Sequence, residues 1–64
     1  MKRRDLERHA RAQGAHPFDE GGNHTRWMGP NGEQSAIPRH REIGYKLART
    51  ICKQLGIAPP AGSR

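Results

Sequence analysis

The sequence predicts a small α+β domain in which a helix is followed by three antiparallel strands and a second helix. Apolar residues recur at helical spacing near both ends of the chain. Between them, two turn sequences, GGN at 21–23 and GPNG at 29–32, separate three short strand-like segments. Strands joined by turns this short pair in antiparallel fashion. With two helices on one face, the other face of the sheet would stay open to solvent or a ligand.

Length and charge limit what this domain can be. A chain of 64 residues, of which 31% are apolar, makes one domain with a small core. We expect the domain to span 1–58 and to be followed by a flexible tail at 59–64, which starts with two prolines. The 12 Lys and Arg residues against 6 acidic ones give a net charge of +6. This charge favours a phosphate-rich partner, nucleic acid first and an acidic protein second; a generically basic soluble protein is the alternative.

The first predicted helix covers residues 3–13. Its sequence, RRDLERHARAQ, contains no Gly, Pro or β-branched residue, and Gly14 ends it. Leu6 and Ala10 lie four residues apart, so the apolar stripe is thin and only one edge of the helix is expected to be buried. The cations at this end of the chain form a basic ridge, either a solvated face or a phosphate-binding surface: Lys2, Arg3, Arg4, Arg8 and Arg11.

The first and third strands are predicted at 15–20 and 33–38. Pro17 cannot donate a hydrogen bond to a neighbouring strand, so the first strand is expected to be an edge strand or to be interrupted. Phe18 is its expected inward-facing residue. Pro38 closes the third strand.

The second strand is predicted at 24–28, with the sequence HTRWM. Because successive side chains of a strand point to opposite faces, His24, Arg26 and Met28 share one face. Thr25 and Trp27 share the other. We expect Trp27 to be the central packing residue of the small core.

The final helix is predicted within IGYKLARTICKQLG, residues 43–56. One apolar face at helical spacing holds Leu47, Ala48, Ile51, Cys52 and Leu55. Gly56 ends the helix, and Ile57 is placed to fold back on its last turn. Cys52 on this face is interpreted as a core residue and not as a nucleophile.

Among the residues that could carry chemistry, His24 follows a Gly-Gly-Asn turn. An imidazole gives or takes a proton at neutral pH. Metal-free RNA cleavage needs a base for the 2′-hydroxyl and an acid for the leaving 5′-oxygen. The turn puts little bulk in front of His24, so a phosphate backbone could approach it, and Arg26 shares its face. The alternative is an ordinary polar strand residue.

The sequence around the other three histidines gives weaker indications of a function. His40 lies between Arg39 and Arg41, which suits phosphate binding or makes a solvated linker. The four histidines, at 9, 16, 24 and 40, lack the tight pair spacing of structural zinc sites. We therefore expect no metal, and no phosphate-binding glycine loop is recognisable, so we expect no cofactor.

The sequence also bears on location. No apolar run approaches the ~20 residues of a membrane span. The start MKRRDLERHA has no apolar stretch behind its basic residues, so it does not match a signal peptide. A single cysteine allows no internal disulfide and fits a reducing cytosol. We expect a cytoplasmic protein without a membrane partner.

Four stretches in register resemble one protein family. KRRDLERH at 2–9, EGGNHTRW at 20–27, PRHREI at 38–43 and ICKQLGI at 51–57 are similar to HicA-type toxins of bacterial toxin–antitoxin pairs. The resemblance runs over about residues 2–58. It implies the α-β-β-β-α fold of double-stranded-RNA-binding domains and an mRNA interferase that cleaves mRNA without a metal and stops translation. It also implies a cognate HicB-type antitoxin that covers the catalytic surface.

The resemblance implies a role for His24, because the family's catalytic histidine follows a Gly-Ser or Gly-Asn pair. The turn that would expose this histidine consists of Gly21, Gly22 and Asn23. The second catalytic group is not implied, and four residues are candidates for it, or for phosphate contacts, on chemistry alone: Arg26, Arg39, His40 and Lys46.

The chain also departs from the family pattern. Its first strand is less apolar than usual, Asn23 stands where serine is common, and Gly44 stands where proline or asparagine often begins the last helix. Two other functions stay open: an RNA-binding module that does not cleave, and a degenerate toxin that retains only antitoxin binding.

Overall fold

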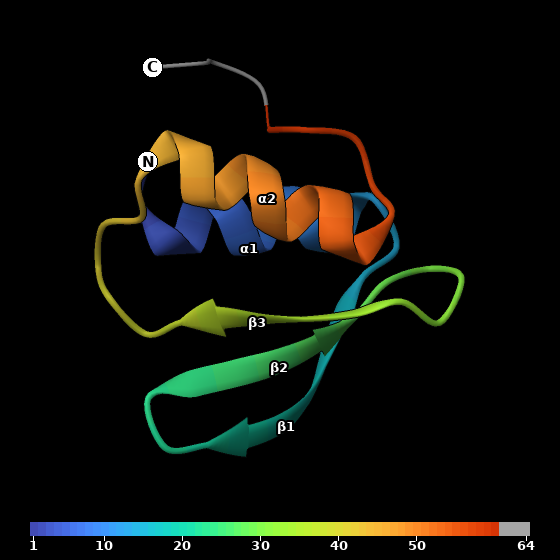
Figure 1. The fold of residues 1–64 in the computed structure, drawn as a ribbon, viewed down its shortest axis with the longest axis horizontal. Coiled ribbons are helices and arrows are strands. Elements are labelled where there is room, and N and C mark those ends of the chain that lie inside the picture. Colours follow the sequence, from blue (N-terminus) through green and yellow to red (C-terminus); the bar gives the residue numbers. More distant parts are fainter. Residues whose placement is uncertain (61–64) are drawn as a thin grey trace.

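The computed structural model describes residues 1–60 and confirms the predicted order of elements (Figure 1). These elements are α1 (Arg3–Ala12), β1 (His16–Gly21), β2 (His24–Met28), β3 (Gln34–Pro38) and α2 (Tyr45–Leu55). The flexible tail expected at 59–64 stays a prediction, since 61–64 lie outside the described residues. None of the helices within 1–60 has the length and apolar character needed to cross a membrane.

The three strands form one antiparallel sheet in the order β1-β2-β3, as predicted. Gly21 pairs with His24, so the loop between β1 and β2 has two residues. Gly22 in this loop has a φ of +54° and Asn23 has a negative φ, the sign pattern of a type II′ hairpin turn. In the second turn, the N–H of Gly29 donates to the carbonyl of Glu33 at 2.6 Å.

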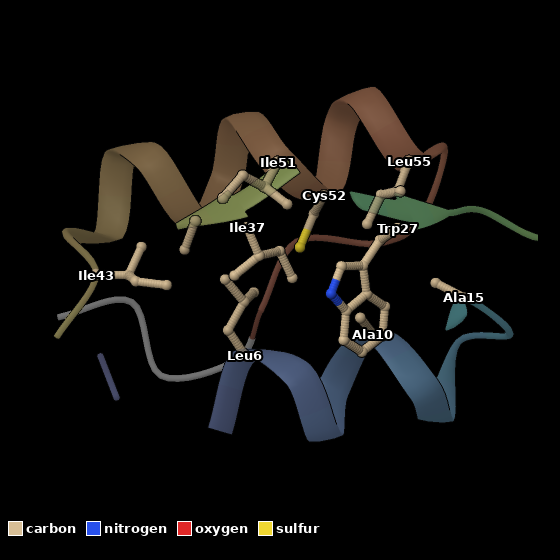
Figure 2. Packing of buried hydrophobic residues seen from close by; sticks show 10 residues of the cluster. Leu6, Ala10, Ala15, Trp27, Ile37, Ile43, Ile51, Cys52 and Leu55 are labelled. Carbon is tan, nitrogen blue, oxygen red and sulfur yellow. The ribbon is translucent and has the colours of Figure 1, made fainter. Parts of the chain in front are cut away.

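Both helices cover one face of the sheet, and the core lies between these two layers (Figure 1). Trp27 of β2 is 1% exposed and is the largest buried side chain. Figure 2 shows its indole among Leu6 and Ala10 of α1 and Leu55 of α2. The predicted central role of Trp27 is confirmed, and the sheet face turned away from the helices, hereafter the outer face, stays open.

Phe18 was expected to face inward, and this expectation is wrong, because its side chain is 41% exposed. The pairing of β1 with β2 shifts register between Pro17 and Asp19, so Phe18 occupies an irregular position in the strand. It lies on the outer face, where the guanidinium of Arg26 sits 5.3 Å from the centre of its ring. The irregular pairing that begins at Pro17 is thus accompanied by the outward position of Phe18.

Leu47 was expected on the buried face of the final helix, but it is 45% exposed. The buried positions of α2 form a narrower stripe: Ala48, Ile51, Cys52 and Leu55. Leu47 precedes this stripe by one residue and therefore lies on its flank, about 100° around the helix. The core at this end is filled by Ile43, which is 2% exposed and lies before the helix begins.

The end of α2 follows the prediction. Gly56 has a φ of +72°, its N–H donates to the carbonyl of Lys53, and the N–H of Ile57 donates to that of Cys52. These bonds form a Schellman motif, and Ile57 packs against the core. The chain then turns back: the ring Nε2 of His9 lies 2.8 Å from the carbonyl oxygen of Ala58.

Candidate functional site

His24 is the first residue of β2 and is exposed on the outer face. Its neighbours on the adjacent strands are Gly21 of β1 and Pro38 of β3. The next residue, Thr25, is buried toward the helices, and this alternation places the His24 side chain on the opposite side of the sheet. The imidazole is therefore accessible to a ligand from solvent.

The turn before His24 leaves its surroundings open. A Cβ atom built on Gly21 or on Gly22 would meet no other atom within 4 Å. Gly22 needs the positive φ of the turn, whereas Gly21 does not. The backbone here is thus held by the turn geometry, while the space around it is free for an approaching phosphate.

Arg26 shares the outer face with His24, at the next outward position along β2. Its guanidinium lies between neighbours from both adjacent strands: Asp19 at 3.7 Å and the side-chain oxygen of Gln34 at 3.4 Å. It also lies over the ring of Phe18. These contacts are exposed to solvent and hence weak, so they orient the guanidinium while leaving it able to contact an anion.

Arg39 lies at the same end of the sheet but on its helix side. Its Nε donates to Oγ1 of Thr25 at 3.3 Å, and its Nη2 lies 3.5 Å from the carboxylate of Glu20. Its backbone N–H donates to the carbonyl of Asn23 at 3.0 Å. Arg39 is therefore next to the turn that precedes His24, although its side chain points to the other side of the sheet.

The other two candidate residues lie outside the sheet. His40 is exposed in the connection between β3 and α2. Lys46 is exposed on α2 and lines a groove with Arg49, Thr50 and Lys53. Because α2 belongs to the helix layer, Lys46 lies on the side of the sheet opposite to His24. Of the four candidates, Arg26 is the one that belongs to a strand and shares the sheet face of His24.

Two features of the surface were missed from the sequence. One is the stacking of Arg26 on Phe18, which depends on the register shift in β1. The other is a pocket of about 420 Å³ whose lining consists of cations: Lys2, Arg3, Arg4, Arg39 and Arg41. The basic ridge predicted for the first helix includes three of these cations. Arg39 and Arg41 are recognisable in the sequence as cations on either side of His40, but nothing there indicates that they would meet the start of the first helix.

The described residues offer no obvious place for a metal ion or a reactive thiol. Within 1–60, no group of three or more His, Cys, Asp and Glu side chains is arranged to hold a metal. Cys52 is buried in the core, as predicted, and this burial raises the pKa of its thiol. The neutral thiol is a poor nucleophile.

Comparisons with known proteins add one match. A family model described as "HicA toxin of bacterial toxin-antitoxin" matches residues 3–57. Neither the comparison with curated proteins nor that with solved structures returned a match. The matched range includes all five elements of the fold and His24 with its turn.

Proposed function

The chain belongs to the HicA toxin family of bacterial toxin–antitoxin systems, and on that premise we propose that it is an endoribonuclease that cleaves mRNA without a metal and so blocks translation. The observation that carries this proposal is the position of His24, exposed on an open sheet face behind a turn with free space around it. The net charge of +6 supports a polyanionic substrate.

In the proposed reaction, His24 acts as a general acid or base on the scissile phosphodiester. Its imidazole takes the proton of the attacking 2′-hydroxyl or gives one to the leaving 5′-oxygen. The exposed guanidinium of Arg26, on the same face, stabilises the negative charge that develops on the phosphorane. Arg39, His40 and Lys46 are proposed only as contacts to more distant phosphates, because none of them belongs to a strand of the sheet.

Membership of the family implies an antitoxin partner. We propose that a HicB-type antitoxin covers the outer face and thereby blocks access to His24. Phe18, which is 41% exposed, and the exposed Ala36 give this face apolar surface on either side of Arg26. Such surface around a polar centre suits a protein partner. The complex would form in the bacterial cytoplasm.

The proposal is tested by inducing wild type, His24→Ala and His16→Ala side by side in bacteria and following growth and mRNA integrity. His16 is the matched control, because it is exposed on the same face at the far end of β1, opposite Met28. We expect wild type and His16→Ala to arrest growth and fragment mRNA, and His24→Ala to do neither.

Two outcomes would replace the proposal by another function. If pure wild-type protein holds labelled RNA tightly for hours and leaves it intact, the chain is an RNA-binding module. If wild type neither arrests growth nor cleaves RNA, yet binds its antitoxin, the chain is a degenerate toxin.

A further inference from the structure

The five-cation pocket is built by two segments that are far apart in sequence. Its first three residues come from the start of α1 and the other two from the connection after β3: Lys2, Arg3, Arg4, Arg39 and Arg41. Main-chain hydrogen bonds hold the segments together. The N–H of Arg3 donates to the carbonyl of Arg41 at 2.8 Å, and the N–H of Ile43 donates to that of Met1, also at 2.8 Å. The pocket is therefore a fixed part of the fold.

The positive charge of this pocket is poorly compensated. Arg3 lies 3.8 Å from the carboxylate of Glu7, and Arg39 lies 3.5 Å from that of Glu20. Lys2, Arg4 and Arg41 have no carboxylate within 4 Å among residues 1–60. Like charges held close together repel each other, and a bound anion relieves this repulsion.

The guanidinium of Arg3 has a fixed position at the wall of this pocket. Its Nη1 donates to the carbonyl of Arg39 at 2.7 Å. Its Nε is buried, makes no hydrogen bond among the described residues and lies 3.8 Å from the carboxylate of Glu7. A guanidinium held in this way can present its remaining Nη donors to a phosphate oxygen.

One wall of the pocket lies near His24 in space, although the two are far apart along the chain. Its wall residue Arg39 follows Pro38, the β3 partner of His24, and is bonded to Asn23 through the backbone. The start of α1, the connection after β3 and the β1–β2 turn all lie at the same end of the molecule (Figure 1). A strand bound at His24 therefore reaches the pocket by passing over this end of the sheet.

We propose that this pocket binds the phosphate backbone of the same RNA strand whose scissile bond lies at His24, several nucleotides away from the cleavage point. This inference rests on the proposed function. RNA is favoured over a protein partner because no apolar side chain lines the pocket, whereas the centre of a protein interface is typically apolar. In this proposal the pocket strengthens the binding of long RNA, whereas His24 takes part in the cleavage step.

The proposal predicts how substrate length and charge affect the kinetics. A distal phosphate contact is made equally in the bound substrate and in the transition state, so its loss raises KM and leaves kcat unchanged. An RNA too short to reach the pocket is insensitive to the same loss. Each lost phosphate contact lowers the salt dependence of binding, by a slope of about 0.7 for a single strand.

The test compares Arg4→Gln/Arg41→Gln with the control Arg8→Gln/Lys53→Gln, which removes the same charge from positions outside the pocket. Both are assayed on RNAs of about 20 and about four nucleotides. For the long RNA we expect the pocket variant to have a KM about tenfold above that of the control, with the same kcat. For the short RNA we expect equal values. Equal KM values for the long RNA would overturn the proposal.

Binding of uncut RNA separates this proposal from the proposed function. In a His24→Ala background, the Kd of the long RNA is measured by fluorescence anisotropy for the pocket and control variants. A weaker Kd for the pocket variant supports the pocket even if wild type proves unable to cleave. An unchanged Kd combined with weaker antitoxin binding would assign the pocket to the protein partner and overturn the RNA assignment.

Discussion

The backbone N–H of Arg39 donates a hydrogen bond to the carbonyl of Asn23, at 3.0 Å. This bond joins the residue after β3 to the residue before His24. The candidate catalytic imidazole and the cation pocket are thus connected through the main chain and not through exposed side chains. Substitution of side chains in the pocket should therefore leave the position of His24 unchanged.

The geometry of the β1–β2 turn predicts different effects for substitutions of its two neighbouring glycines. Gly22→Ala forces an alanine into a φ of +54°, and we expect this strain to cost about 1–2 kcal/mol of unfolding free energy and to lower RNA cleavage. Gly21 does not have a positive φ, and a Cβ atom at this position would meet no atom within 4 Å. Gly21→Ala should therefore behave like wild type. Urea unfolding and a cleavage assay check both variants. Equal losses for the two would refute the assigned turn geometry.

Two leucines of α2 test which face of this helix is buried. Leu55 is fully buried, and we expect Leu55→Ala to cost about 2–5 kcal/mol, enough to unfold a large share of so small a domain. Leu47 is 45% exposed, and Leu47→Ala should change the unfolding free energy by less than about 1 kcal/mol. Urea unfolding followed by Trp27 fluorescence measures both. A larger loss for Leu47→Ala than for Leu55→Ala would contradict the observed packing.

Arg26 gives a prediction about activity without a change in stability. We expect Arg26→Ala to lower the cleavage rate about 100-fold, because a cation near the developing charge is lost. Its ion pair with Asp19 is exposed, so the thermal unfolding midpoint should stay near that of wild type. Arg8→Ala is the control, since Arg8 is an exposed cation on α1 whose ion pair with Asp5 is also exposed. The role of Arg26 is refuted if both variants cleave RNA at the same rate.

Cys52 gives a prediction about pH. Because burial raises the pKa of this thiol in the folded chain, the unfolded chain loses the proton at a lower pH. The thiol's contribution to stability is therefore fully present below the unfolded pKa and is lost as pH rises through the folded one. We expect the stability advantage of wild type over Cys52→Ala to be smaller near about pH 10 than near about pH 7. Urea unfolding at the two pH values checks this, and an advantage that grows with pH would contradict it.

The sequence predicts those parts of the fold that local signals control. Glycines at required backbone angles mark the turn at Gly22 and the helix end at Gly56, and period-two alternation places Trp27 in the core. The errors at Phe18 and Leu47 have another cause. Each depends on the register of one element against its neighbour, which periodicity within a single element does not contain.

The candidate site also has a part that the sequence predicts and a part that it does not. His24 and Arg26 share a face because they are two residues apart on one strand, and this follows from the sequence. The positions of Arg39 and Lys46 relative to His24 depend on how the last helix and its connection pack on the sheet. The cation pocket depends on pairing between residues near 3 and 41, so composition indicates its charge but not its shape.

The central claim is that His24 performs the RNA cleavage. Its most direct measurement is the cleavage rate of a labelled mRNA by purified wild type, His24→Ala and His16→Ala in the presence of EDTA, with unfolding curves recorded for all three. We expect His16→Ala to cleave at the wild-type rate. We expect His24→Ala to unfold like wild type but to cleave at least about 100-fold more slowly. A folded His24→Ala variant that cleaves at the wild-type rate would contradict the central claim.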